Sequence, residues 1–248
     1  MELDYFTGKK VMFVCGAGLG VASGLPTYYG ANGIYKELEK EFGMSIEDAL
    51  SETMFKHNPA IVWNHIRKIA SSTTGAKPNI GHEKIREICR VADEAIVVTQ
   101  NVDGLQQLDN QDELYEIHGS GKTATCTECE SVYKSPLEIN TTVPTCEVCK
   151  TALKPDVVLF EGYPKFKGQY DKLCDFAASA DILICVGTQV AFPYVADLLN
   201  HTAHGKGIIH WVDIEQPDFT MSFVDAAAVN QAMFTFTEGA EEYFGAIA

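Results

Sequence analysis

Five apolar runs along the chain are typical of strands that are buried on both faces of a sheet: residues 11–15, 95–99, 156–160, 182–186 and 208–213. Helical patterns separate several of these runs, as in residues 82–91, where Ile85, Ile88 and Cys89 recur on one face. Strands that alternate with helices predict an α/β fold with a doubly wound parallel sheet.

Residues 35–78 do not follow that alternation, because their pattern is helical throughout. Ser45 with Asp48 resembles a capping box, and Asn58-Pro59 resembles an N-cap followed by a proline in the first helical position. We expect this stretch to form a helical module outside the main sheet.

Four of the eight cysteines form a second exception, with the pattern Cys126-x-x-Cys129 and Cys146-x-x-Cys149. Two thiolate pairs at this spacing can surround a structural zinc ion, and two disulfides are the alternative. The segment around them is rich in Thr, Glu and Pro, so we expect the metal to hold it together. The remaining cysteines lie in apolar runs typical of a core: Cys15, Cys89, Cys174 and Cys185.

The two exceptions predict a smaller lobe made of a helical module, residues 35–78, and a zinc ribbon, residues 121–153. The large domain is then expected to comprise residues 1–34, 79–120 and 154–248. A ligand is expected in the cleft between the two lobes.

Composition narrows the class of protein. The chain has 248 residues, of which 46% are hydrophobic, and 19 Lys and Arg against 34 Asp and Glu give a net charge of −15. A disordered chain is excluded, and non-specific nucleic-acid binding is not expected from so acidic a protein. The acidity suits a basic partner such as a Lys-rich peptide, or serves solubility alone. No leader or membrane-spanning pattern is seen, and we expect a cytoplasmic location.

Glycines follow the first predicted strand, in the run Gly16-Ala17-Gly18-Leu19-Gly20. Such a loop lets backbone N–H groups approach a phosphate, although a plain turn between a strand and a helix has the same appearance. A carboxylate for a ribose could come from Asp213 or Glu215, at the end of the last predicted strand.

Polar residues follow the strand predicted at 95–99, in the run from Gln100 to Asp103. This run is a capped turn or part of a ligand site at the same sheet edge. His118 lies between Ile117 and Gly119, just before the cysteine segment. It is a structural histidine or, beside a nucleotide, a general base.

In combination, these residues make the chain resemble the sirtuin family over nearly its whole length. The motifs that carry the resemblance occur in order: Gly16-Ala17-Gly18, Ser23-Gly-Leu-Pro26, Gly30-Ala-Asn-Gly33-Ile-Tyr35, Pro78-Asn79, Thr99-Gln-Asn-Val-Asp103, Ile117-His-Gly119, the four cysteines, Lys154-Pro155-x-Val-Val158-x-Phe160, Val186-Gly-Thr188 and Pro193. The resemblance implies a Rossmann-like large domain, bound NAD and Zn²⁺, and transfer of an acyl group from an acyl-lysine to ADP-ribose with release of nicotinamide.

The resemblance also implies roles for individual residues. His118 would be the base and Asn101 a second catalytic residue. The expected NAD contacts are Gly16, Ala17, Gly18, Val21, Thr27, Tyr28, Tyr29, Gln100, Asn101, Asp103, Gly187, Thr188, Gln189, Asp213 and Glu215. The substrate peptide would add as a strand between Val157, Val158 and Phe160 on one side and Val190 on the other.

Several positions depart from the family pattern. Pro26-Thr27-Tyr28-Tyr29 replaces the usual Pro-Asp-Phe-Arg, which removes a cation expected near NAD. Further departures are Gly20 for a usual Ser, Phe160-Glu161-Gly162 for Phe-Gly-Glu, Gln189 for a usual Ser, and Asp213 where Asn is common. Relatives that remove acidic acyl groups carry Tyr and Arg where this chain has Ile66 and Ile69, so we expect an acyl group that is not acidic.

Three functions agree with these observations. The first is an NAD-dependent protein-lysine deacylase, with acetyl-lysine as the expected substrate. The second is another NAD-consuming reaction, ADP-ribosyl transfer or NAD hydrolysis, which the altered Tyr28-Tyr29 pair favours. The third is an NAD-sensing module with little turnover. The oligomeric state is open.

Overall fold

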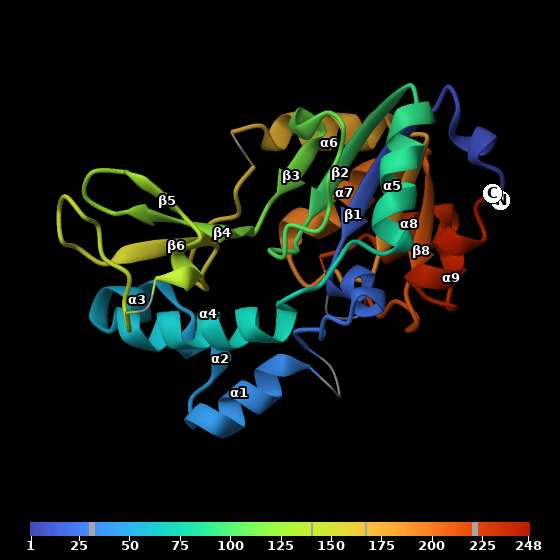
Figure 1. The fold of residues 1–248 in the computed structure, drawn as a ribbon. Helices are drawn as coiled ribbons and strands as arrows, with labels where there is room; N and C mark the ends of the chain where they lie inside the picture. Colours follow the sequence, from blue (N-terminus) through green and yellow to red (C-terminus); the bar gives the residue numbers. More distant parts are fainter. Residues whose placement is uncertain (30–32, 140, 167, 220–222) are drawn as a thin grey trace.

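The computed structural model describes residues 1–29, 33–139, 141–166, 168–219 and 223–248. Its main sheet has six parallel strands in the order β3-β2-β1-β7-β8-β9 (Figure 1). Their bounds are β1 Lys10–Cys15, β2 Glu94–Thr99, β3 Leu114–Glu116, β7 Ile182–Val186, β8 Ile208–Val212 and β9 Met233–Phe236. All strands run the same way, so the loops after them meet at one carboxyl edge of the sheet.

Helices cover both faces of this sheet, as the doubly wound prediction requires. Along β1, Met12 and Val14 pack in one apolar core while Val11 and Phe13 pack in the other. The first core contains residues of α6 Tyr170–Ser179, α7 Pro193–His204 and α8 Ala226–Ala232; the second contains residues of η1 Leu3–Phe6, α5 Ile80–Val91 and α9 Ala240–Gly245. Within the described ranges, no helix has the length and apolar character to cross a membrane.

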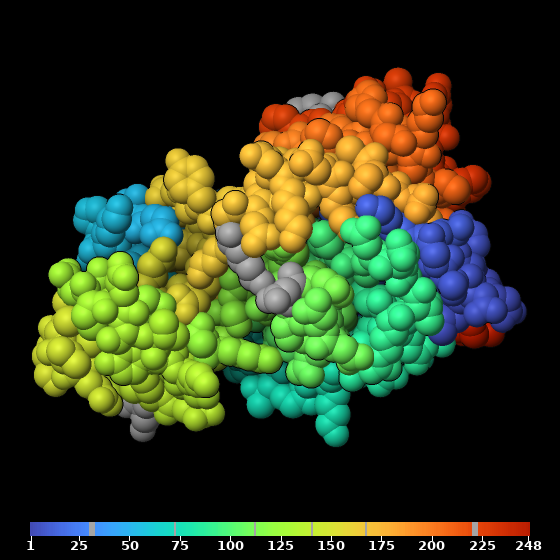
Figure 2. Space-filling model, turned by 90° about the horizontal axis from the view of Figure 1, so that it is seen from above, coloured from blue at the N-terminus to red at the C-terminus, as the bar shows by residue number. Residues whose placement is uncertain are grey.

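A second, antiparallel sheet lies beside the main one, in the order β5-β4-β6 (Figure 1). Its strands are β4 Gly119–Cys126, β5 Val132–Lys134 and β6 Leu153–Val157. Figure 2 shows the residues of this sheet, in green to yellow, forming a lobe that stands out from the rest of the molecule. The sheet therefore extends slightly beyond residues 121–153 at both ends.

Four helices pack beneath this sheet: α1 Ile34–Phe42, α2 Ile46–Ala49, α3 Glu52–His57 and α4 Pro59–Thr73 (Figure 1). The buried indole of Trp63 on α4 donates a hydrogen bond of 2.8 Å to the Leu153 carbonyl oxygen of β6. Ser45 is the N-cap of α2, because its Oγ accepts from the Asp48 N–H at 3.1 Å. Pro59 opens α4 as expected, but the Asn58 side chain makes no capping hydrogen bond.

For the main sheet, the sequence-based strand assignment is wrong in one place and incomplete in two. Residues 156–160 do not form a strand of the main sheet, since β6 ends at Val157 and pairs with β4. β3 and β9 were not expected. β3 has three residues, too few for a periodic pattern, and β9 is a sheet edge whose residues are half-buried or exposed.

A substitution of Gly119 tests how closely β4 and β6 pack where the two sheets meet. Its φ is +80°, and a Cβ there would lie 1.9 Å from the Asp156 carbonyl oxygen. Gly119→Ala should lower the free energy of unfolding by about 2 kcal/mol or more, because left-handed strain and a backbone clash add. Gly75→Ala is the matched control, with φ +82° and no atom within 4 Å of a Cβ. Equal midpoints of urea unfolding for the two variants would contradict the clash.

Candidate active site

The glycine loop after β1 lies in direct backbone contact with the loop after β7. The Gly16 N–H donates to the Val186 carbonyl and the Gly18 N–H to the Gly187 carbonyl, both at 2.9 Å. A Cβ on Gly18 would lie 2.5 Å from the Gly187 Cα, so a side chain cannot fit there. The loop continues as a 3-10 helix, η2 Ala17–Ser23, and its close approach brings two strand ends together.

The polar run after β2 lies at this same edge, as predicted. Asn101 is buried, and its Nδ2 donates to the Gly16 carbonyl oxygen at 2.9 Å. The Gln100 Nε2 donates to the Thr188 Oγ1 at 2.8 Å. Loops that follow β1, β2 and β7 are therefore joined by side chains that the sequence predicted for one ligand site.

Asn79 attaches α5 to the glycine loop. Its Oδ1 caps α5 by accepting from the Gly81 N–H at 2.9 Å, and its Nδ2 donates to the Leu19 carbonyl at 2.8 Å. The oxygen and the nitrogen of the Asn79 amide thereby hold the glycine loop against the start of α5.

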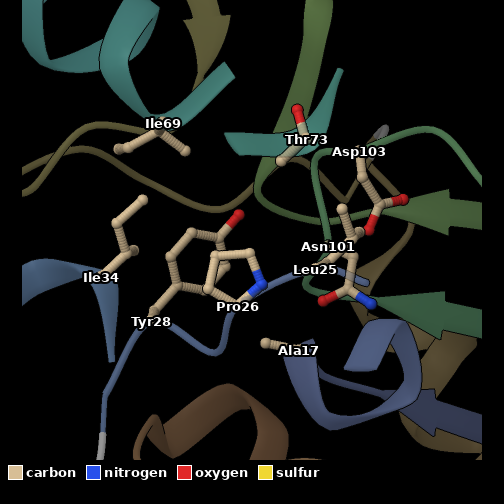
Figure 3. Close-up of a pocket in the computed structure, with 9 residues that line it drawn as sticks. All are labelled: Ala17, Leu25, Pro26, Tyr28, Ile34, Ile69, Thr73, Asn101 and Asp103. Carbon is tan, nitrogen blue, oxygen red and sulfur yellow. The ribbon is translucent and has the colours of Figure 1, made fainter. Parts of the chain in front are cut away.

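A cavity lies between the glycine loop and the helical module, and Tyr28 is one of the residues that line it (Figure 3). Its volume of about 20 Å³ has room for one water molecule. A ligand the size of an aromatic ring can enter only if these side chains separate. Burial raises the pKa of Tyr28 to about 12, so its phenol is neutral at pH 7. The lining residues are Ala17, Leu25, Pro26, Tyr28, Ile34, Ile69, Thr73, Asn101 and Asp103.

His118 lies between β3 and β4, where the two sheets meet. Its carbonyl oxygen accepts from the Val158 N–H at 2.7 Å, and its ring lies 5.4 Å from the Phe192 ring, edge to face. Its Nε2 lies 2.6 Å from the Tyr194 hydroxyl. Burial lowers the pKa of His118 to about 4, although a hydrogen bond to the Gln100 backbone opposes the shift. The ring is neutral at pH 7, the state that a general base requires.

The residues predicted for the adenosine half of a nucleotide form a second polar group. The Gln189 Nε2 donates to the Glu215 Oε2 at 3.2 Å, and the Glu215 N–H donates to the Asp213 Oδ1 at 3.1 Å. Burial raises the pKa of the Asp213 carboxyl. These side chains lie just after β7 and β8, at the carboxyl edge of the sheet.

Four of the predicted cofactor residues line the cavity, Ala17, Tyr28, Asn101 and Asp103, whereas Tyr29, Val21 and Thr27 do not. Tyr29 is 52% exposed, and its hydroxyl lies 3.5 Å from the Glu47 Oε1 on α2. Val21 is 53% exposed on η2. Thr27 turns its Oγ1 back to the Tyr29 carbonyl at 3.0 Å. Residues 30–32, part of the motif before Tyr35, lie outside the described residues.

Of the residues predicted to hold an acylated peptide, Val158 contacts His118 directly, through the hydrogen bond to the His118 carbonyl. Val157, Phe160, Ile66 and Ile69 belong to one apolar cluster, while Val190 is fully buried in the core beneath α7. Ile69 also lines the cavity, whereas Ile66 is not one of its lining residues. The backbone of residues 189–191 donates no hydrogen bond to another backbone group within the described part of the chain. Gln189 and Ala191 are exposed, whereas Val190 between them is fully buried.

The four cysteines lie together at the end of the small sheet, with their sulfur atoms all within 4.8 Å of one another. The two Cys-x-x-Cys turns have the same backbone hydrogen bond. The Glu130 N–H donates to the Cys126 carbonyl and the Lys150 N–H to the Cys146 carbonyl, each at 3.0 Å. Glu130 and Lys150 also share positive φ values, +58° and +63°. All eight cysteines are free thiols. Four sulfurs in two matching turns fit a tetrahedral zinc ion and no catalytic position.

A sequence model described as the Sir2 family matches residues 16–192, which is more than half of the chain. The chain belongs to the Sir2 family. An NAD-dependent protein deacylase 2 of Pseudomonas syringae pv. tomato is 31% identical over 219 residues, which cover 85% of this chain and 86% of that protein. An NAD-dependent protein deacetylase of Bacillus cereus is 32% identical over 197 residues, covering 76% of each chain.

Solved structures support the same fold. A Sir2 homologue mutant in complex with ADP-ribose has a TM-score of 0.79 at 23% identity, covering 98% of this chain and 92% of that one. A Sir2 protein with a p53 peptide and NAD⁺ has a TM-score of 0.75 at 20% identity, covering 95% and 90%. At these identities the likeness establishes the Rossmann-like sheet and the smaller lobe.

Two residues of this Sir2-family site were missed by sequence reasoning. Tyr194 was passed over because a tyrosine in the first turn of an amphipathic helix looks like core packing. Glu161 was noted only as an inversion of order, yet its Oε2 accepts from the Thr53 N–H at 3.0 Å and from the Thr53 Oγ1 at 2.7 Å. It therefore stabilises the first turn of α3.

The cysteine cluster gives the test of the metal. Cys149→Ser should lose the bound zinc and unfold the small sheet, because structural zinc contributes on the order of 10 kcal/mol of folding free energy. Cys89→Ser, outside the cluster, should keep one zinc per chain. Elemental analysis of freshly purified, reduced protein and its circular dichroism measure both effects. Stable, zinc-free wild-type protein would refute the site.

Proposed function

We propose that this protein is an NAD-dependent protein-lysine deacylase, with acetyl-lysine as a preferred substrate. It would transfer the acyl group to ADP-ribose and release nicotinamide. The observation that carries the proposal is the position of His118. Its backbone carbonyl accepts a hydrogen bond from the Val158 N–H, and its neutral imidazole ring packs on Phe192. One base thus lies between the two segments expected to hold a peptide.

The loops at the sheet edge fit NAD. The close contact of Gly18 with Gly187 sets the position of the loop after β1, and a pyrophosphate would lie against this loop at the start of η2. Gln100, Asn101 and Asp103 would hold the nicotinamide and its ribose, and Thr188 and Glu215 the adenosine half. When bound, NAD supplies the electrophilic ribose carbon and the nicotinamide leaving group.

The peptide segments fit an extended chain. A cavity of about 450 Å³ lies beside Val157 and Val158, lined also by Lys56, Glu161 and Tyr163. It has room for the side chains that flank an acyl-lysine, while the apolar residues around Ile69 would receive the acyl group. Acyl-lysine proteins are therefore the proposed partners, and the net charge of −15 gives no reason to propose nucleic acid.

We also propose the division of the chain into a large NAD-binding domain of residues 1–34, 79–120 and 154–248, a helical module of residues 35–78 and a zinc module of residues 121–153. The cysteines form no disulfide, which favours a reducing compartment, and we propose the cytoplasm.

ADP-ribosyl transfer or NAD hydrolysis is the second candidate. It is favoured by Tyr29, which points to Glu47 and leaves no arginine at that position. Nicotinamide release, measured with and without an acetyl-lysine peptide, separates the two. Release that depends on the peptide supports deacylation, and release without it supports the second candidate. Tight NAD binding with no release in either case would contradict both.

His118→Ala tests the base. Net deacylation should fall by roughly 10²–10⁴-fold, while NAD affinity changes by a few fold at most. Nicotinamide exchange should survive better than deacylation, because the proton is removed after nicotinamide has left. His201→Ala, at an exposed position on α7, is the control. Near-normal deacylation by His118→Ala would overturn the assignment.

The acyl preference follows from the absence of a cation. Asp103 is the only charged residue among those lining the described cavity. A succinyl carboxylate beside Ile69 would be buried without a partner, at a cost of several kcal/mol. We expect kcat/KM to be higher for acetyl- and butyryl-lysine peptides than for the succinyl peptide, with butyryl controlling for chain length. A faster reaction of the succinyl peptide would contradict this pocket.

A further inference from the structure

Both ring nitrogens of His118 have partners. Nε2 lies 2.6 Å from the Tyr194 hydroxyl oxygen, and the hydrogen bond to the Gln100 backbone therefore belongs to Nδ1. The Gln100 N–H already donates to the Cys15 carbonyl at 2.9 Å, so the Gln100 group that bonds to His118 is its carbonyl oxygen, and the ring donates to it. A neutral imidazole with hydrogen on Nδ1 has its acceptor lone pair on Nε2. Tyr194 thus donates its hydroxyl proton to that lone pair.

This arrangement limits how a proton can reach His118. An imidazole nitrogen has one lone pair in the ring plane, and on Nε2 it faces the Tyr194 oxygen. A second hydroxyl cannot share it while Tyr194 is in place. A hydroxyl oxygen, however, accepts one proton while donating another.

Aromatic contacts hold Tyr194 in this position. Its ring stacks on Phe192, with 5.3 Å between centroids and 8° between planes, and lies 5.6 Å from Phe166, edge to face. Pro193 before it opens α7. Among the described residues, no charged side chain has a hydrogen bond or ion pair with His118 or Tyr194. Both rings are partly exposed, so a substrate can approach the pair.

We propose that Tyr194 is a further catalytic residue, whose hydroxyl relays a proton from the substrate ribose to His118. As the substrate hydroxyl gives its proton to the Tyr194 oxygen, the Tyr194 proton moves to Nε2. At the Tyr194 oxygen one O–H bond breaks and another forms, so the tyrosine stays neutral. The positive charge ends on the imidazolium ring of His118. The inference rests on the proposed deacylase function, in which His118 is the base.

The hydrogen bond can be tested first in the protein without substrate. In Tyr194→Phe, which keeps the stacked ring, the ¹⁵N resonance of His118 Nε2 should move. Tyr170→Phe is the matched control, because Tyr170 also packs on Phe166 but donates to Asp197 rather than to His118. Its His118 resonances should stay in place. An unchanged Nε2 resonance in Tyr194→Phe would overturn the proposal.

The relay is tested in the reaction. Tyr194→Phe should lower kcat for deacylation by about 10²-fold, as for a lost acid–base group, with KM for NAD and peptide within about twofold. Nicotinamide exchange should be retained. Tyr170→Phe should react at the wild-type rate.

A double-mutant cycle separates a relay from a structural role. If the proton passes through Tyr194 to His118, adding Tyr194→Phe to His118→Ala should cost almost nothing further. A full additional loss, or a kcat of Tyr194→Phe that is unchanged or raised, would overturn the relay; a raised kcat would make Tyr194 a gate. A fully active His118→Ala variant would instead refute the proposed base, independently of Tyr194.

Discussion

The contact between the glycine loop and the loop after β7 is the constraint on which the rest of the site depends. A Cβ on either Gly18 or Gly187 would lie 2.5 Å from the backbone of the other loop, and Gly187 has a φ of +61°. Because β1 and β7 are parallel neighbours, both loops leave the same sheet edge. Their contact leaves Gln100 within reach of Thr188 and Asn101 within reach of Gly16. Hydrogen bonds at these positions then follow from short polar side chains at the end of β2.

His118, the proposed base, is positioned by a second constraint, the junction of the two sheets. His118 is followed at once by Gly119, where β4 begins and where a carbonyl of β6 leaves no space for a side chain. The small sheet is held at its other end by the four cysteines and from beneath by the Trp63 indole. The zinc site thus supports the backbone next to His118 through β4, the strand that runs from Gly119 to Cys126.

The sequence predicted those elements whose signal is local. β1, β2, β7 and β8 are apolar runs buried on both faces, and the cysteine spacing by itself indicated a metal site. Residues 156–160 have a similar apolar character, but their pairing with β4 depends on the zinc module, a long-range contact that periodicity does not report. β9 pairs only with β8, so its pattern is that of an exposed edge. The resemblance supplied most of the site, whereas the hydroxyl of Tyr194 could be placed against His118 only in three dimensions.

Three of the positions that depart from the family pattern make specific contacts in the structure. Glu161 takes a left-handed conformation, φ +70°, that a glycine would adopt without strain. Its carboxylate offsets this backbone strain by accepting two hydrogen bonds from Thr53. These hydrogen bonds lower the pKa of the Glu161 carboxyl. Gln189 reaches Glu215 across the sheet edge, a span that a serine is too short to cover. Tyr29 turns to Glu47, so the cation missing from the site is replaced by a contact that joins residues 26–29 to α2. At Tyr29, Glu161 and Gln189 the departing side chain makes a hydrogen bond within the protein, so each of these three positions joins two segments of the chain.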